Sequence, residues 1–393
     1  TDAAPAEKKG RVELKSFVDV PEDHDFSIHN LPFGVFTPKG DAEAKPRCGV
    51  AIGDNVVDLS AVADADLLGN FKHAGCFHQP RLNDFMGRGK ASWRSVRNTV
   101  QQLLLESNTA LRDSTAGAKA IRPASEVVMH LPATIGDYTD FYSSREHATN
   151  VGTMFRGKDN ALQPNWLHLP VGYHGRSSSV IPSGTAIRRP RGQLQKDNAD
   201  PKQGSVFGPC RLMDFEVEIG AFVGTGNALG EPIDIREAAD KIFGLVLMND
   251  WSARDIQKWE YVPLGPFTAK NVATTISPWI VTTDALVSRL ANPSLLQFCD
   301  DPKVDALRWL VLTYALLSRS VSLCISAGPV PIATSAGTQV DPEPLPYLRD
   351  PNYGSYNINL SVAIQDEEMA APHVISRTNF RFVTTHRQSL TLS

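Results

Sequence analysis

The chain has 393 residues, of which 42 % are hydrophobic and 21 % are charged, as in an ordinary globular protein of one or two domains. The formal net charge is −4, and no basic block interleaved with aromatic residues occurs, which argues against a nucleic-acid partner. Five scattered cysteines without a CxxC pair argue against a disulfide framework and a thiolate zinc site, and favour a reducing, cytoplasmic compartment.

Residues 1–24 are polar and charged, lack the apolar core of a secretory signal, and are predicted to form a flexible leader. Residues 25–124 are predicted to form an N-terminal domain. Within it, Gly53-Asp54-Asn55 between two apolar arms predicts a hairpin. Apolar residues at helical spacing predict a helix around residues 93–111. The apolar run 307–325 contains two arginines, which leaves it shorter than the roughly 20 residues of a membrane span, so we expect a soluble protein.

The segment 212–219 alternates apolar and acidic residues. In a β-strand, successive side chains fall on opposite faces, so this segment predicts one apolar and one acidic face. Buried carboxylates about 6.6 Å apart require a compensating cation, whereas an edge strand could simply expose them to water. Both interpretations are open from this segment alone. The apolar face would carry Met213, Phe215, Val217 and Ile219, and the acidic face Asp214, Glu216 and Glu218.

A second acidic segment precedes a predicted helix. Ser143 and Glu146 fit a capping box, which places Asp140 in the loop before the helix and His147 in its first turn. There the helix dipole would lower the histidine pKa and favour a neutral, basic imidazole. An isolated histidine of this kind is more often an ordinary hydrogen-bonded residue than a catalyst. The Gly- and Ser-rich loop 170–179 could wrap a small anion or merely turn.

The apolar run 242–249 predicts a buried strand that delivers Asp250 at its end. Ser252 with Asp255 predicts the cap of a short helix. A polar stripe on that helix would hold Arg254, Gln257 and Tyr261, and a turn leads on to Lys270 and Thr274. The glycines at 224–230 do not have the spacing of a dinucleotide-binding loop.

Carboxylates from three elements, Asp140, Glu216, Glu218 and Asp250, would form an all-oxygen site if they converge. Such a site selects Mg²⁺ or Ca²⁺ rather than zinc. The metal would polarise a carbonyl, and His147 would activate water. Lys270, Arg254 and Gln257 would stabilise an oxyanion or a carboxylate product. The residues alone therefore predict metal-assisted hydrolysis of a carbonyl compound.

Long stretches closely resemble the fumarylacetoacetase (fumarylacetoacetate hydrolase) family. They are 134–152, 164–176, 214–218 and 248–267, with 28–36 near the N-terminus, and the resemblance covers roughly residues 25–286. The resemblance implies a homodimer of mixed α/β, mainly β fold, with a small N-terminal SH3-like barrel and a β-rich catalytic domain over residues 125–393. The implied activity is cleavage of a carbon–carbon bond in 4-fumarylacetoacetate to fumarate and acetoacetate, the last step of tyrosine and phenylalanine catabolism.

The same resemblance implies a role for each matching residue. By the family's motif, Asp140, Glu216, Glu218 and Asp250 would hold Ca²⁺. Asp250, Lys270 and Thr274 match a Mg²⁺ site, where an ammonium group would lie nearby rather than ligate. His147 matches the proton acceptor that activates water, and Arg254 an oxyanion-stabilising arginine. The substrate contacts would be Tyr142, Arg156, Tyr173, Gln257 and Tyr261.

The chain departs from the family at residues 287–339, which match nothing in it, and again after Arg381. The family's later portion carries a substrate-contacting threonine and a glutamate that orients the histidine, and neither is recognised here. Residues 287–339 and the last dozen residues are either read-through of non-coding sequence or, for the former, a genuine surface insertion, which stability tolerates well. The alternative functions are a catalytically impaired or inactive truncated product and another family activity such as acylpyruvate hydrolysis.

Overall fold

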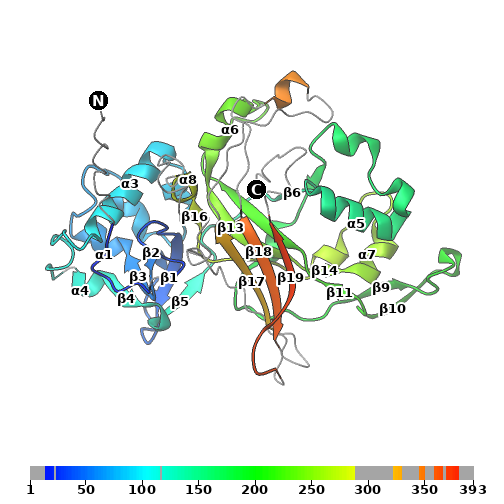
Figure 1. The fold of residues 1–393 in the computed structure, drawn as a ribbon, viewed down its shortest axis with the longest axis horizontal. Coiled ribbons are helices and arrows are strands. Elements are labelled where there is room, and N and C mark those ends of the chain that lie inside the picture. Colours follow the sequence, from blue (N-terminus) through cyan, green and yellow to red (C-terminus); the bar gives the residue numbers. More distant parts are fainter. Residues whose placement is uncertain are drawn as a thin grey trace, which may run out of the picture.

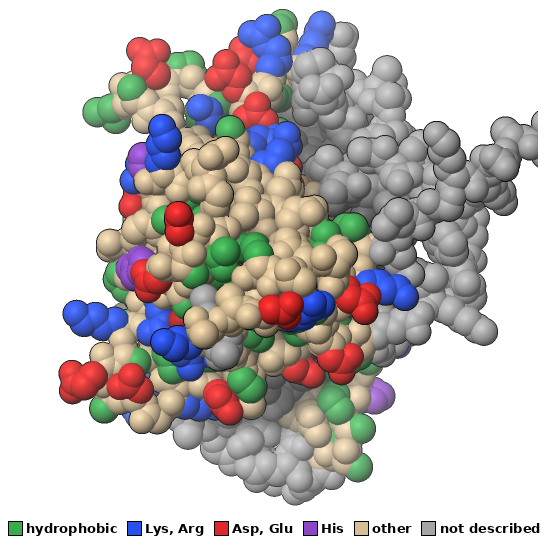
Figure 2. Space-filling model, turned by 90° about the vertical axis from the view of Figure 1, so that its left-hand side faces the viewer, with side chains coloured by type: hydrophobic (Ala, Val, Ile, Leu, Met, Phe, Trp, Pro, Cys, Tyr) green, Lys and Arg blue, Asp and Glu red, His purple; other side chains and the backbone are tan. Residues whose placement is uncertain are grey.

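The computed structural model describes residues 14–21, 24–115, 117–287, 322–329, 345–349, 358–365 and 369–379. An N-terminal unit and a larger, strand-rich unit lie side by side (Figure 1). The predicted mixed α/β, mainly β fold class is confirmed. No helix among the described residues combines the length and the apolar character needed to cross a membrane. On the face of the N-terminal unit seen in Figure 2, acidic and basic side chains are interspersed.

The N-terminal unit is built on a five-stranded antiparallel sheet in the order β4-β3-β2-β1-β5. The predicted hairpin is confirmed, because Ile52 pairs with Asn55 around a turn in which Gly53 has a φ of 50°. The edge strands β4 and β5 do not pair with each other among the described residues, so the sheet is not closed. The strands are β1 (Phe33–Pro38), β2 (Arg47–Ile52), β3 (Asn55–Asp58), β4 (Ile121–Pro123) and β5 (Val127–His130).

Apolar helical faces cover this sheet. The predicted helix exists as α3, but it ends at Leu103 rather than near residue 111, and Leu104 follows as its buried C-cap. Since β5 lies beyond residue 124, we propose that the N-terminal unit extends to the end of β5. The helices of this unit are α1 (Leu59–Asp64), α2 (Asn83–Met86), α3 (Lys90–Leu103) and α4 (Gly117–Ala120).

Part of the predicted flexible leader is instead packed on the N-terminal unit. The backbone N–H of Phe17 donates to the carbonyl of Leu104 at 3.1 Å, and Val18 is only 9 % exposed. Leu14 and Val20 also pack against the buried core. The prediction was wrong for residues 14–21, because apolar residues every few positions give this segment surface to bury. Residues 1–13 lie outside the described residues.

The central sheet of the second unit has the order β12-β13-β15-β8, with β16 also pairing with β13. The predicted buried strand is confirmed as β13, in which all nine residues are buried. Its Phe243 packs against Phe33, Phe85 and Trp93, so the two units share one apolar core. The strands are β8 (Val180–Pro182), β12 (Val217–Val223), β13 (Ile242–Asp250), β15 (Thr274–Ile276) and β16 (Val281–Thr282).

The predicted single strand 212–219 is split in two. β11 (Met213–Asp214) pairs with β14 (Ser252–Ala253), whereas β12 pairs with β13. Two residues separate them, and the backbone N–H of Glu216 donates to the side chain of Asn249 at 3.1 Å instead of joining a ladder. The predicted alternation nevertheless holds. The apolar residues Met213, Phe215, Val217 and Ile219 all pack in one cluster.

A third sheet covers that apolar face. In it, β18 (Ile358–Gln365) lies between β17 (Ser322–Pro329) and β19 (His373–Asn379). Ile358, Leu360 and Val362 of β18 belong to the same apolar cluster as the strand segment 212–219. Figure 1 shows this sheet crossing β13. β17 falls inside segment 287–339, which was predicted from the sequence to be foreign to the family, and the rest of that segment, beyond Val287, lies outside the described residues.

The remaining strands form two small sheets, and four further α-helices follow residue 144 in the described part of the chain. A two-stranded sheet joins β6 (Thr139–Phe141) to β7 (Gly172–His174), and a second joins β9 (Arg191–Gln195) to β10 (Ser205–Pro209). The helices are α5 (Arg145–Arg156), α6 (Ile235–Lys241), α7 (Arg254–Glu260) and α8 (Thr283–Val287). α5 and α7 lie on the same side of the central sheet as β6 (Figure 1).

Candidate active site

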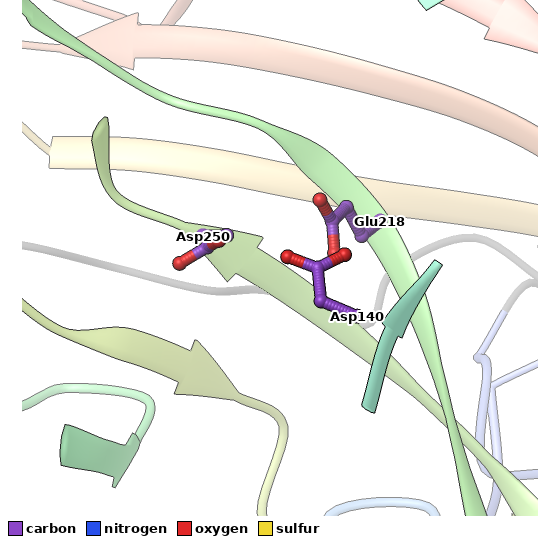
Figure 3. A group of neighbouring side chains, drawn as sticks. All are labelled: Asp140, Glu218 and Asp250. Atoms are coloured by element: carbon purple, nitrogen blue, oxygen red, sulfur yellow. The ribbon is translucent and has the colours of Figure 1, made fainter. Parts of the chain in front are cut away.

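Three carboxylates from three strands converge at one end of the central sheet. One oxygen each of Asp140, Glu218 and Asp250 lies within 4.8 Å of the others (Figure 3). Glu218 pairs with Met248 across β12 and β13, so Glu218 and Asp250 are diagonal neighbours on one face of the sheet. Asp140 was predicted in a loop, but it lies in β6, where it pairs with Tyr173. Backbone pairing thus holds all three carboxylates.

This convergence carries an electrostatic cost. Burial, followed by the charge of Asp250, raises the pKa of Asp140 to about 6. Burial, followed by the charge of Asp140, also raises the pKa of Glu218 well above its ordinary value. The group therefore favours either a proton or a cation at its centre.

Glu216, the fourth predicted metal ligand, faces cationic side chains. Its Oε2 accepts from Lys270 Nζ at 2.5 Å, and its Oε1 lies 2.8 Å from Arg254 Nη1. Burial disfavours the ionised form, but Lys270, His147 and Arg254 together outweigh it and hold the pKa of Glu216 well below its usual range. Lys270 Nζ also donates to Asp250 Oδ2 at 2.8 Å. Lys270 therefore links Glu216 to the three-carboxylate group.

His147 lies in the first turn of α5, as predicted, and its Nε2 is 3.6 Å from Glu216 Oε1. The ring of Tyr142 meets the imidazole edge-on at a centroid distance of 5.6 Å. The predicted cap was wrong by one residue. Ser144, with extended backbone angles, accepts from the His147 N–H at 3.1 Å, so the helix begins at Arg145. Burial, rather than the helix dipole, is the main cause that lowers the pKa of His147.

The polar stripe of α7 faces the same site. Arg254 donates through Nε to Asp214 Oδ2 at 2.8 Å and through Nη1 to Gln257 Oε1 at 3.0 Å. The ring of Tyr261 packs edge-on against Phe155 of α5, with centroids 5.1 Å apart. α5 and α7 are thereby joined across the site.

The predicted cap of α7 was wrong. The N-cap is Ala253, without a side-chain hydrogen bond, because Ser252 belongs to β14 and its hydroxyl donates to the Asp250 carbonyl at 3.1 Å. The Asp255 carboxylate accepts instead from the backbone N–H of Arg211 at 2.7 Å.

Two other predicted substrate contacts, Arg156 and Tyr173, have different surroundings. Arg156 donates to the backbone carbonyls of Asn160 and Ala161 at 3.1 and 2.6 Å, which closes the end of α5. Tyr173 lies opposite Asp140, and burial keeps the pKa of its phenol above the ordinary value.

Sequence reasoning did not assign Arg176, which enters the site from the Gly- and Ser-rich loop. Its Nη2 donates to Asp250 Oδ1 at 2.6 Å and to Thr274 Oγ1 at 2.7 Å. The Thr274 hydroxyl in turn donates to Asp250 Oδ1 at 3.0 Å. The loop was predicted to wrap an anion or turn, and the anion that it meets is a carboxylate of this chain. Only the tertiary structure supplies that partner.

The charges of the site fit a bound divalent cation. Four carboxylates (Asp140, Glu216, Glu218 and Asp250) face three permanent cations (Arg176, Arg254 and Lys270), and Arg254 is shared with Asp214. A negative charge is left over where the three oxygen ligands converge. Hard oxygen donors of this kind suit Mg²⁺, Ca²⁺ or Mn²⁺.

Comparisons with known proteins agree on one family. The model "Fumarylacetoacetase N-terminal" matches residues 29–132, and "Fumarylacetoacetate (FAA) hydrolase C-terminal" matches residues 137–297. Fumarylacetoacetases from Bos taurus and Homo sapiens are each 50 % identical over 372 residues, covering 94 % of this chain and 77 % of theirs. The Dictyostelium discoideum fumarylacetoacetase is 49 % identical over 373 residues, 94 % of this chain and 76 % of its own.

Among solved structures, a fumarylacetoacetate hydrolase from psychrophilic Exiguobacterium antarcticum aligns with 89 % of this chain and 98 % of its own. Its TM-score is 0.38 and its identity 14 %, too distant a similarity to carry an argument. The sequence matches, in contrast, span both units and the strands that hold the carboxylates. They reach residue 297, so the prediction that the resemblance ends at residue 286 was wrong for residues 287–297. On the basis of the sequence matches, the chain belongs to the fumarylacetoacetase family.

Proposed function

We propose that this protein hydrolyses 4-fumarylacetoacetate to fumarate and acetoacetate, as an enzyme of tyrosine and phenylalanine catabolism, with a divalent cation as cofactor. The observation that carries the proposal is the placement of His147 and Glu216 beside the converging carboxylates Asp140, Glu218 and Asp250. A water-activating base and an electrophilic centre are the two parts that hydrolysis of a carbonyl compound needs. The names of the similar proteins supply the substrate.

The cation would be held by Asp140, Glu218 and Asp250, with Glu216 linked to them through Lys270. When bound, it supplies Lewis-acid polarisation of a carbonyl oxygen. Mg²⁺ and Ca²⁺ both suit an all-oxygen site, and we propose these two as the cofactors. Thr274 does not need to bind the cation itself, because its hydroxyl donates a hydrogen bond to Asp250 Oδ1 and thereby orients that carboxylate.

The imidazole of His147 acts as the general base. The Glu216 carboxylate, 3.6 Å from Nε2, favours the tautomer with its proton on Nε2, which leaves Nδ1 to accept a proton from water. The resulting hydroxide attacks the carbonyl carbon, and the adjacent carbon–carbon bond breaks. Its electron pair leaves with acetoacetate as a carbanion, which takes back the proton from the imidazolium.

Cationic side chains stabilise the negative charge that develops. Lys270 and Arg254 already contact Glu216, and Arg254 also holds Gln257. We propose that Arg254 and Lys270 stabilise the oxyanion, and that Tyr142, Tyr173, Gln257 and Tyr261 orient the substrate. Arg156 would contribute by fixing the end of α5, or by turning from its backbone partners to a substrate carboxylate.

We also propose a cytoplasmic homodimer. Val206 and Phe207 on β10 are 43 % and 68 % exposed, so this hairpin offers apolar area to a second copy. Light scattering after gel filtration measures the assembly. A monomeric wild-type protein contradicts this part of the proposal without affecting the activity.

The activity is tested by mixing the purified protein with 4-fumarylacetoacetate and Mg²⁺ or Ca²⁺, and by quantifying both products. We expect equal amounts of fumarate and acetoacetate, loss of turnover with a chelator, and recovery on adding the metal back. Acylpyruvates serve as comparison substrates. Turnover of an acylpyruvate but not of fumarylacetoacetate contradicts the substrate assignment, and turnover unaffected by chelation contradicts the metal dependence.

A further inference from the structure

Arg176 stands out because it is a nearly buried cation in the site that no predicted role explains. Its side chain is 14 % exposed, and its guanidinium lies over the ring of Tyr138, 5.9 Å from the centroid. Its Nε and Nη1 are buried without a hydrogen-bond partner in the described part of the chain. Unpaired buried donors are costly, so a residue of this kind calls for an explanation other than stability.

The contacts of Arg176 complete a clamp around Asp250. Oδ1 accepts from Arg176 and from Thr274, while Oδ2 accepts from Lys270 on the opposite side. Both oxygens of this fully buried carboxylate therefore have a fixed orientation. Groups that hold a ligand carboxylate in this way typically change metal affinity by 10- to 100-fold when they are removed.

Arg176 also connects two sheets. Asp140 lies on the small β6–β7 sheet, whereas Glu218 and Asp250 lie on the central sheet. Arg176 follows β7 by two residues and reaches across to Asp250 on β13 and Thr274 on β15. Its contact therefore ties the strand pair that carries Asp140 to the strands that carry its two partners.

We propose that Arg176 is a positioning residue, which orients Asp250 and fixes the distance between the two sheets so that the three carboxylates can share one cation. This inference rests on the metal site of the proposed function. It makes a prediction that simple electrostatics opposes. Removing the positive charge of Arg176 should tighten cation binding, because the repulsion between the guanidinium and the metal ion is lost. Loss of the positioning of Asp250 should instead weaken cation binding.

The test is the affinity of the whole chain for Mn²⁺, measured by calorimetry for the wild type, Arg176→Gln, Arg176→Lys and Arg189→Gln. We expect the affinity of Arg176→Gln to fall by about tenfold or more. Arg176→Lys keeps the charge but not the forked geometry, and we expect a smaller loss. Arg189 is exposed and donates to the Cys210 carbonyl, so Arg189→Gln should bind like the wild type. Unchanged or tighter binding by Arg176→Gln overturns the inference.

A second measurement does not depend on the metal. Hydrogen exchange in the metal-free protein reports whether the β6–β7 sheet is anchored. We expect faster exchange at residues 139–141 and 172–174 in Arg176→Gln, and no change there in Arg189→Gln. If the wild type binds no Mn²⁺, the metal part of the proposed function fails, and unchanged exchange in Arg176→Gln would then overturn the positioning role as well.

Discussion

His147 Nε2 lies 3.6 Å from Glu216 Oε1, so the first turn of α5 contacts the turn between β11 and β12. Glu216 is fixed in turn by Lys270 and Arg254. A carboxylate in this position stabilises the imidazolium that forms when the histidine takes up a proton. Catalysis should therefore depend on His147 while binding of the metal does not.

Replacement of His147 by alanine should lower the turnover number by about 10²- to 10⁴-fold, the usual contribution of a general base. Steady-state cleavage of fumarylacetoacetate measures the effect, and Mn²⁺ affinity should remain near the wild-type value. His168→Gln, at an exposed histidine after the same helix, is the control. Activity of His147→Ala within about threefold of wild type would exclude the histidine as the base.

Metal binding should weaken as the solution becomes acidic. Burial raises the pKa of Asp140 from its ordinary value of 3.8 to about 6 in the metal-free protein. Folded protein then binds this proton more tightly than unfolded chain does, so lowering the pH from about 7 to about 5 stabilises the metal-free fold through Asp140. A cation needs the ionised carboxylate, and protons displace it over the same range.

The measurement is thermal unfolding with and without Mg²⁺ between about pH 5 and about pH 7. We expect the Mg²⁺-induced rise in Tm to shrink below about pH 6, by mass action. Asp140→Asn, which cannot titrate, should show a small rise at every pH. A wild-type rise that is equal at both ends of the range would contradict the assignment.

Replacement of Lys270 by methionine should destabilise the fold. The ammonium, whose side chain is 4 % exposed, contacts both Glu216 and Asp250. Its removal leaves each of these buried carboxylates with a single cationic partner, Arg254 or Arg176. The expected loss is about 3 kcal/mol or more in the free energy of unfolding, measured with urea. Lys202→Met, at an exposed lysine, should change it by less than about 0.5 kcal/mol. Equal stabilities of the two variants would show that Lys270 is not the compensating charge.

Replacement of Ser144 by alanine should remove the cap of α5. The loss of one hydrogen bond to the His147 N–H should cost about 1 kcal/mol of stability and reduce turnover, because the cap fixes the first helical turn. Ser143→Ala is the matched control and should have little effect. A larger loss of stability in Ser143→Ala than in Ser144→Ala would show that Ser143 caps the helix, as the sequence predicted.

Local patterns in the sequence were sufficient for much of the fold. The continuous apolar run of β13 predicted a buried strand, and the turn at Gly53 predicted a hairpin, because both signals depend on near neighbours. The alternation around Phe215 predicted its apolar face correctly even though the strand itself is split. The caps of α5 and α7 were misplaced, because a serine near a helix start is common and the backbone angles decide whether it caps. Ser144 rather than Ser143 caps α5, and the N-cap of α7 is Ala253.

The sequence by itself determined which residue types the site contains, through its acidic strand, its histidine and its similarity to a family. The tertiary structure alone decided how those charges are paired. It placed Glu216 among cations rather than with Asp140, Glu218 and Asp250, and it brought Arg176 to Asp250. The physical reason is that Coulomb energies depend on distances and burial, which are set by contacts between strands far apart in the chain.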